Sequence, residues 1–274
     1  MRPKDVDALP SSTPTLVASY GADPLQIGEL RLPPGKGPFP VAVVVHGGCW
    51  TKGFATRQNT AALASAITEM GFATWNIEYR QIGEVGAGWP GTFKDWGAAT
   101  DYLRTLAKTQ PLDLRRVAVV GHSAGAHAAL WIASRSKLPA RSAIGARHPL
   151  AIKVAVAIDG PGDLTPFVGV DAEICGKPVI VPLLGGTPKA RPERYRLASP
   201  IDTLPVLTKE YLIASAVLSA EDAEQYRAAA KRKGQAVNVL TVENGGHFDI
   251  IAPGSAAWIG QVEPFLAKAL SGDK

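Results

Sequence analysis

The sequence predicts an α/β domain with a mostly parallel central sheet of about eight strands and helices on both faces. Apolar runs of strand length alternate with amphipathic segments of helix length almost to the C-terminus, which is typical of this class. The run VAVVVHGG that follows Pro40 is continuously apolar at its start, as expected of a strand buried on both faces. No linker interrupts the alternation, so residues 1–274 are predicted to form a single domain.

The remaining elements follow from the same patterns. Residues 15–32 predict two strands around a Gly-Ala-Asp-Pro turn, at an antiparallel edge of the sheet. Further strands are expected in GFATWNIEY, VAVVGH, KVAVAIDG, EYLIASA and AVNVLTV. Helical periodicity covers residues 58–70, 94–108, 124–136, 220–233 and 255–270.

Two segments depart from the alternation. Residues 1–14 contain no apolar stretch and are expected to be a flexible N-terminal segment. Residues 160–205 are rich in Pro and Gly and form the longest region without clear periodicity. Because long loops in compact domains tend to cover functional sites, this region is predicted to be a small cap, lid or pocket wall.

Composition and charge exclude several classes of protein. With 46% hydrophobic and 19% charged residues, the chain is too apolar to be disordered and too mixed to be fibrous. The net charge of +5 comes from scattered cations, and the densest cluster, at 231–233, suits a helix C-terminus. Without a basic stripe interleaved with aromatic residues, a nucleic-acid partner is not expected.

The sequence predicts neither a membrane partner nor export. No run of about 18 apolar residues occurs, and no export signal is visible, so a cytoplasmic location is expected. The two cysteines, Cys49 and Cys175, form no C-x-x-C or Cys/His cluster, which argues against a zinc site. Whether these two cysteines form a single disulfide stays open at this point.

The segment Gly121–Gly125 (GHSAG) matches the G-x-S-x-G pattern of a nucleophilic serine. It lies between a predicted strand and a predicted helix, which is the context that the pattern requires. The turn is so tight that small residues must flank Ser123, and its hydroxyl then stands clear of the sheet at a helix N-terminus. Ser123 is therefore the predicted nucleophile.

A serine hydroxyl needs a base that takes its proton, and His247 is the best-placed histidine. It lies in GGHFD, after the last predicted strand and before the final helix. His46 belongs to another motif, whereas His122 and His127 are expected to make local hydrogen bonds or packing contacts.

The segment His46–Trp50 (HGGCW) is a candidate oxyanion loop. It follows the first parallel strand, and its glycines allow backbone N–H groups to face a cleft. The predicted donors are the N–H groups of Gly48, Cys49 and Ala124. Cys49 is predicted to be a wall of the site.

These three motifs, in this order, resemble the α/β-hydrolase superfamily, and more narrowly its HGG-x-W esterase branch, which includes arylformamidases and hormone-sensitive-lipase-like carboxylesterases. The resemblance spans about residues 26–270, and it implies an α/β-hydrolase fold and hydrolysis through an acyl-enzyme intermediate. Further residues that look like this branch are Glu78-Tyr79-Arg80, Trp89-Pro90-Gly91 and Asp95.

The acidic member of the triad is where the chain departs from the family pattern. The family's acid usually lies after the strand that corresponds to EYLIASA, but the loop 216–220 has no carboxylate. Arylformamidase-like sequences can place the acid at a helix start, as in D-x-x-E-aromatic, which favours Asp222. Ser219–Asp222 is also a capping box, in which Asp222 would serve only the helix. Glu221, Asp163, Asp202 and a triad without an acid remain as alternatives.

The predicted function is hydrolysis of short-chain or aryl carboxylic esters by a serine hydrolase without metal or organic cofactor. Arylformamidase activity on N-formylkynurenine-type amides is the runner-up, and a non-catalytic ligand-binding protein of the same fold is the alternative from another class. The expected partner is a small-molecule ester or amide. Candidate residues of an apolar or aromatic substrate pocket are Trp50, Phe54, Trp89, Phe167 and Phe248.

Overall fold

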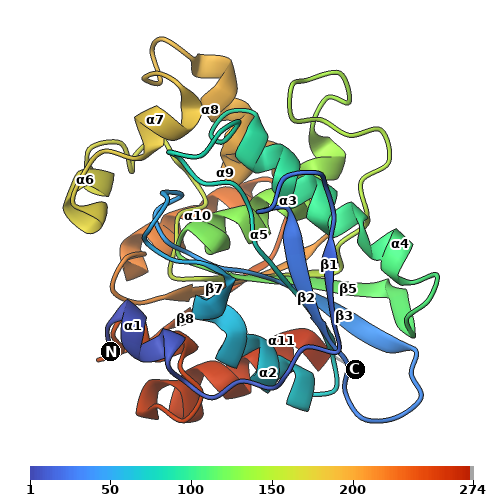
Figure 1. Cartoon of the computed structure of the whole chain (residues 1–274). Helices are drawn as coiled ribbons and strands as arrows, with labels where there is room; N and C mark the ends of the chain where they lie inside the picture. Colours follow the sequence, from blue (N-terminus) through green and yellow to red (C-terminus); the bar gives the residue numbers. More distant parts are fainter. Residues whose placement is uncertain (272–274) are drawn as a thin grey trace.

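Figure 1 shows the computed structural model of the chain, which describes residues 1–271. Within them, eight strands form one sheet in the order β1-β2-β4-β3-β5-β6-β7-β8. The strands are β1 (Leu16–Ser19), β2 (Ile27–Arg31), β3 (Phe39–Val45), β4 (Ala73–Ile77), β5 (Leu112–His122), β6 (Val154–Ile158), β7 (Lys209–Ala214) and β8 (Val237–Thr241). The six strands from β4 to β8 in this order run parallel, and β1 and β2 form an antiparallel edge. The predicted fold class is confirmed.

Helices cover both faces of the sheet (Figure 1). One face carries α2 (Ala61–Glu69) and α11 (Glu263–Ser271), and the other carries α3 (Gly91–Asp101), α5 (Ala124–Ser134) and α10 (Ala220–Arg232). Shorter turns are α4 (Leu103–Leu106), the 3₁₀ turns η1 (Arg57–Thr60), η2 (Arg135–Lys137) and η3 (Asp249–Ile251), and the π-turn η4 (Trp258–Val262).

Strand β3 explains the continuous apolar pattern. Val41, Val43 and Val45 point into the core beneath α3 and α5, whereas Ala42 and Val44 point into the core beneath α2 and α11. Successive side chains of a strand face opposite sides, so a strand covered on both sides needs apolar residues at every position.

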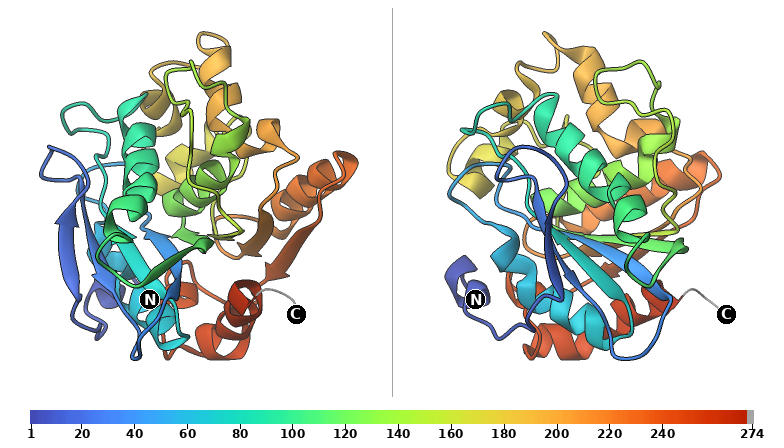
Figure 2. Two further views of the ribbon diagram at one scale, coloured as in Figure 1. Left: turned by 90° about the vertical axis from the view of Figure 1, so that its right-hand side faces the viewer. Right: turned by 45° about the vertical axis from the view of Figure 1, so that its right-hand side comes forward.

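Residues 160–205 form a cap of short helices rather than an irregular loop. They contain α6 (Val170–Cys175), α7 (Ile180–Leu184), α8 (Pro192–Ala198) and α9 (Pro200–Thr203). Each helix has seven residues or fewer, so none is long enough for helical periodicity to appear in the sequence. The two views of Figure 2 show the cap helices, in yellow and orange, on the same side of the sheet as α3 and α5.

The N-terminal segment packs against the domain, which corrects the expectation of a flexible end. Residues Pro3–Asp7 form helix α1, and Val6 is fully buried against the core beneath α2. Further along, the N–H of Ser12 donates to Ser65 Oγ at 2.8 Å. A single buried side chain and scattered polar contacts give no periodic signal, which is why the sequence did not predict this packing.

No helix within residues 1–271 is long and apolar enough to cross a membrane.

Candidate active site

Ser123 occupies the sharp turn between β5 and α5. Its backbone has φ 58° and ψ −119°, a conformation that L-residues rarely adopt and that typifies a nucleophile elbow. The neighbouring glycines are required by close approach, because a Cβ on Gly121 would lie 1.8 Å from the carbonyl oxygen of Gly125. A Cβ on Gly125 would in turn lie 2.1 Å from Val45 O. The turn predicted from GHSAG is therefore present in the structure.

Asp159 lies behind His247. His247 Nδ1 and Asp159 Oδ2 are 2.7 Å apart, and the Asp159 side chain is completely buried. Since an ionised carboxylate only accepts hydrogen bonds, Nδ1 carries the hydrogen and Nε2 keeps a free lone pair. This is the tautomer that a general base needs.

The Asp159 carboxylate is held by the loop after the next strand. It accepts hydrogen bonds from the backbone N–H groups of residues 215–218, at 2.8 to 3.2 Å. Asp159 itself has φ 55°, a left-handed conformation that directs its side chain across the end of β7. These four donors and the imidazole fix the carboxylate in one orientation.

The preferred candidate Asp222 is not beside His247, and this placement corrects the prediction. Asp222 lies in the first turn of α10 and bonds the N-cap residue: its N–H donates to Ser219 Oγ at 3.0 Å, and its carboxylate accepts from the same hydroxyl at 2.7 Å. Of the alternatives, Glu221 accepts from Gln225 at 3.3 Å, and Asp163 accepts from the N–H of Thr165 at 3.0 Å.

The fourth candidate, Asp202, is not the partner of His247 either. It lies in α9, where burial and the nearby Asp163 carboxylate raise its pKa.

The sequence motifs did not predict a role for Asp159, because the family pattern places the acidic residue in the loop after β7. Asp159 follows β6 instead, and the parallel pairing of β6 with β7 puts the two strand ends side by side. One usable signal was present: Asp159 is the first carboxylate directly after the apolar run 154–158. Functional groups of parallel sheets gather at such carboxyl ends.

Ser123 lies between the elements that carry its two partners. Its N–H donates to Ile158 O, next to Asp159, at 2.8 Å. The preceding residue, His122, has its ring centroid 4.3 Å from that of His247, and its Nε2–H donates to His247 O at 2.8 Å. No hydrogen bond between Ser123 Oγ and the His247 ring is present among the described residues; in free enzymes this contact often forms only when substrate binds.

His122 positions the His247 loop, in agreement with the local role expected for it. Burial and the neighbouring His247 lower the pKa of His122 well below its usual value, so the ring is neutral. The loop has a second anchor, because Ser215 Oγ donates to Gly245 O at 2.6 Å. His127 is also neutral, since burial lowers its pKa to about 4, and it bonds Ala198 O.

The loop His46–Trp50 presents unused donors next to the serine. Gly48, Cys49 and Trp50 all have positive φ, at 98°, 52° and 51°. Within residues 1–271, no hydrogen bond uses the N–H groups of Gly48, Cys49 or Ala124. Ala124 is the first residue of α5, where N–H groups lack intrahelical partners.

A buried hydrogen bond between His46 and Glu78 supports this loop from behind. His46 Nε2 lies 2.7 Å from Glu78 Oε1, and His46 Nδ1 lies 2.8 Å from Gly47 O. Burial alone would raise the pKa of Glu78, but His46 and the N–H groups of Arg57 and Tyr79 hold that pKa below its usual value. The conformation of the loop is therefore tied to β4 through Glu78.

A small apolar cavity adjoins Ser123. Its volume is about 20 Å³, counted as the space open to the centre of a water-sized sphere. Its lining comes from the loop His46–Trp50, the turn around Ser123, the cap and the loop after β7: Cys49, Trp50, Ser123, Ala124, Pro161, Phe167, Asp171, Ile174, Cys175, Ile180 and Val217. Of the five predicted pocket residues, Trp50 and Phe167 are in this lining.

The other three predicted pocket residues lie elsewhere. Phe54 is 41% exposed, with Lys177 Nζ 5.4 Å from its ring centroid. Trp89 packs against Phe93. Phe248 packs against the rings of His122 and His247 and is not in the lining of the cavity. An aromatic residue near a motif in sequence need not face the same side of the chain.

Cys49 and Cys175 form a disulfide between the candidate oxyanion loop and the end of α6. Both residues also line the cavity beside Ser123. The sequence left open whether these two cysteines are bonded, and in the structure they are.

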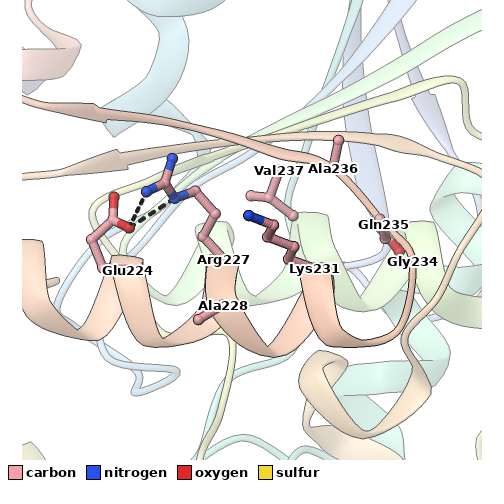
Figure 3. Close-up of a pocket in the computed structure, with 8 residues that line it drawn as sticks. All are labelled: Glu224, Arg227, Ala228, Lys231, Gly234, Gln235, Ala236 and Val237. Carbon is pink, nitrogen blue, oxygen red and sulfur yellow. Dashed lines mark hydrogen bonds and ion pairs between the residues drawn. The ribbon is translucent and has the colours of Figure 1, made fainter.

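A larger hollow, of about 640 Å³, lies along α10 and the start of β8 (Figure 3). It carries no serine, cysteine or histidine, and its one carboxylate, Glu224, is bonded to Arg227 at 2.7 Å. Val237 begins β8, whereas His247 follows the other end of that strand, so this hollow is separate from the candidate site around Ser123 and His247. Among residues 1–271, no group of three or more His, Cys, Asp or Glu side chains is arranged to hold a metal ion.

Known structures share the fold over nearly the whole chain. A truncated carbohydrate esterase from gut microbiota matches with a TM-score of 0.75 and 18% identity, covering 95% of this chain and 98% of its own. Esterase B from Lactobacillus rhamnosis matches with a TM-score of 0.79 and 17% identity, covering 98% and 90%. The propionate-bound thermophilic esterase Est2 from Thermogutta terrifontis matches with a TM-score of 0.71 and 16% identity, covering 91% of each chain.

A comparison with curated proteins finds no match. The BD-FAE family, in contrast, matches residues 29–214, which is more than half of the chain. This segment includes the candidate oxyanion loop, the turn around Ser123 and Asp159. The chain therefore belongs to the BD-FAE family, an esterase family with the α/β-hydrolase fold that the sequence motifs predicted.

Proposed function

We propose that this chain is a serine esterase whose triad is Ser123, His247 and Asp159. The observation that carries the proposal is the 2.7 Å contact between His247 Nδ1 and the buried Asp159 carboxylate, next to a serine on a strand-to-helix elbow. A carboxylate so placed fixes the tautomer of the imidazole and stabilises the imidazolium that forms when the serine loses its proton.

The reaction follows from these positions. His247 Nε2 takes the proton of Ser123 Oγ as the oxygen attacks the ester carbonyl, and the N–H groups of Gly48, Cys49 and Ala124 stabilise the oxyanion. The imidazolium then gives its proton to the leaving alcohol, and an acyl-enzyme remains. Water, activated by the same imidazole, releases the carboxylic acid and restores Ser123. None of these steps requires a metal or an organic cofactor.

The size of the cavity favours a short acyl group. The centre of a water-sized sphere can occupy only about 20 Å³ of this cavity, so the cavity is narrow, and its lining of mostly apolar side chains suits a small acyl group. We therefore propose acetyl-sized esters as substrates. One similar structure is described as a carbohydrate esterase, so acetylated oligosaccharides belong in the substrate panel beside p-nitrophenyl and aryl acetates.

Arylformamidase activity is the second candidate, because a formyl group is smaller still and fits the same cavity. Turnover of p-nitrophenyl acetate and of N-formylkynurenine separates the two. We expect a higher kcat/KM for the acetate, and the opposite ranking would favour the arylformamidase.

The main reason for considering a non-catalytic binding protein no longer applies. It depended on the missing acid in the loop after β7, and Asp159 offers a carboxylate from β6 in its place. An active-site fluorophosphonate probe tests this alternative directly: we expect one label per chain on Ser123, and folded protein that does not label would favour the binding role.

The test of the nucleophile is Ser123→Ala. We expect kcat on p-nitrophenyl acetate to fall on the order of 10⁵-fold, since loss of a triad serine removes nearly the whole chemical step. A Ser123→Ala protein with native activity would overturn the assignment.

The disulfide indicates in which kind of cellular compartment the protein works. Structural disulfides persist in oxidising compartments and are rare in the cytosol. Because Cys49 and Cys175 are bonded in the folded protein, we infer that the enzyme works in an oxidising compartment, in place of the cytoplasmic location expected from the sequence. Its proposed partner is a small-molecule ester.

A further inference from the structure

The Cys49–Cys175 disulfide joins two walls of the cavity beside Ser123. Cys49 belongs to the oxyanion loop, and Cys175 is the last residue of α6 in the cap. Both cysteines line the cavity together with their neighbours Trp50 and Ile174. The bond therefore holds the end of α6 against the oxyanion loop at the wall of the cavity.

The loop side of the bond is firmly held. Three consecutive residues, Gly48, Cys49 and Trp50, have positive φ, which is costly for the two that are not glycine. Hydrogen bonds from Thr51 N to Gly48 O at 2.9 Å and from Ile82 N to Trp50 O at 2.6 Å keep this conformation in place. The loop therefore gives Cys49 a fixed position, to which the disulfide holds α6.

On the cap side, few contacts other than the bond hold the Cys175 end of α6. Helix α6 is six residues long, and Figure 1 shows it at the outer edge of the molecule. Two of its apolar side chains, Val170 and Ile174, are 46% and 38% exposed, so little apolar surface attaches it to the body. The buried Asp171, in its first turn, accepts hydrogen bonds from the N–H groups of Val179 and Ile180, which are themselves buried in the core. These bonds attach the start of α6 to the body, whereas the disulfide attaches its other end.

We propose that this disulfide determines the acyl-chain specificity of the enzyme by holding α6 against the oxyanion loop. The inference rests on the proposed esterase function. With the bond intact, the narrow cavity accepts an acetyl group, and the two further methylenes of a butyryl group press on the wall to which Ile174 and Cys175 contribute. Without the bond, α6 yields and longer acyl groups enter.

The experiment compares wild type with Cys49→Ser/Cys175→Ser. Each substitution replaces sulfur by oxygen and leaves the backbone N–H of residue 49 in place, so it is the covalent bond that is lost. The readout is the ratio of kcat/KM for p-nitrophenyl butyrate to that for p-nitrophenyl acetate. We expect this ratio to rise about tenfold or more in the double variant, because one methylene in a tight pocket already changes specificity by that amount.

Reduction of the wild type provides the second measurement. Dithiothreitol supplies the two electrons and two protons that convert the S–S bond into two thiols, and itself becomes a cyclic disulfide. Treated wild type should reach the ratio of the double variant, and treatment of the double variant should change nothing. This arm keeps the proposal testable if the double variant does not fold.

Ile174→Ala is the matched control, since it trims the same wall and leaves the bond intact. We expect it to raise the ratio less than loss of the bond does. An unchanged ratio in both the reduced wild type and the double variant, with Ser123 still labelled by a fluorophosphonate, would overturn the role of the disulfide. If wild type neither labels nor hydrolyses either ester, the failure lies in the proposed function.

Discussion

Asp159 illustrates how a single side chain can serve an element to which it does not belong. It follows β6, yet the backbone N–H groups that hold its carboxylate come from the loop after β7. Its partner His247 follows β8. The residue therefore connects the ends of three neighbouring strands at the carboxyl edge of the sheet.

The substitution Asp159→Asn tests the hydrogen bond between residue 159 and His247. The amide presents donors as well as an acceptor to His247, so the wrong tautomer of the imidazole is favoured. We expect kcat on p-nitrophenyl acetate to fall about 10³ to 10⁴-fold, with little change in KM. Asp222→Asn is the matched control and should retain native activity. The reverse pattern would return the catalytic role to Asp222.

Glu210 is a buried carboxylic acid whose ionisation should make the stability of the protein depend on pH. Its carboxyl, at the start of β7, accepts from Gln235 Nε2 at 2.8 Å and from Tyr226 Oη at 3.3 Å. Glu210 Oε1 has no hydrogen-bond partner within residues 1–271. Burial raises the pKa of Glu210 to about 8, from the ordinary value of 4.5. The folded protein therefore keeps a proton at pH values where the unfolded chain has released it.

We expect the contribution of Glu210 to stability to be present below about pH 4.5 and to be lost as pH rises to about 8. The free energy of unfolding should fall by a few kcal/mol across this window. Glu210→Gln, which mimics the protonated acid, should flatten the slope. Urea unfolding between pH 5 and pH 8.5 measures how the free energy of unfolding changes with pH. Glu243→Gln, at an exposed position, is the control. Equal slopes in wild type and Glu210→Gln would refute the assignment.

At the scale of elements, α10 shows one acidic residue with a purely structural role. Ser219 is its N-cap: the side-chain oxygen accepts from Asp222 N and donates to the Asp222 carboxylate. A cap of this kind satisfies N–H groups that have no partner inside the helix. The helix then packs Ala223, Tyr226 and Ala230 into the core.

Ser219→Ala should lower the free energy of unfolding by about 1 kcal/mol, because the cap is lost and the rest of the helix stays. Esterase activity should not change, since neither Ser219 nor Asp222 lies in the triad. Chemical denaturation and an activity assay of the same preparation check both parts. A large loss of activity with unchanged stability would contradict this description of α10.

At the scale of the whole molecule, the disulfide connects positions 126 residues apart and links the cap to the first parallel strand's loop. A cross-link that closes a long loop restricts the unfolded chain. We expect Cys49→Ser/Cys175→Ser to lower the free energy of unfolding by about 2 to 4 kcal/mol. Guanidinium unfolding of wild type with and without reductant measures the same quantity. A double variant as stable as wild type would show that the cap is anchored by other contacts.

Short stretches of the sequence are enough to predict the α/β class, the order of the motifs, the turn around Ser123 and the position of His247 after the last strand. These features are local: a continuous apolar run, a Gly-x-Ser-x-Gly turn and a histidine before a helix each depend on neighbouring residues. The contact of Asp159 with His247, the bond between Cys49 and Cys175 and the packing of the N-terminal segment become visible in the folded chain. Those pairings depend on which strand ends and loops become neighbours across the sheet, and no short stretch of the chain shows which of them do.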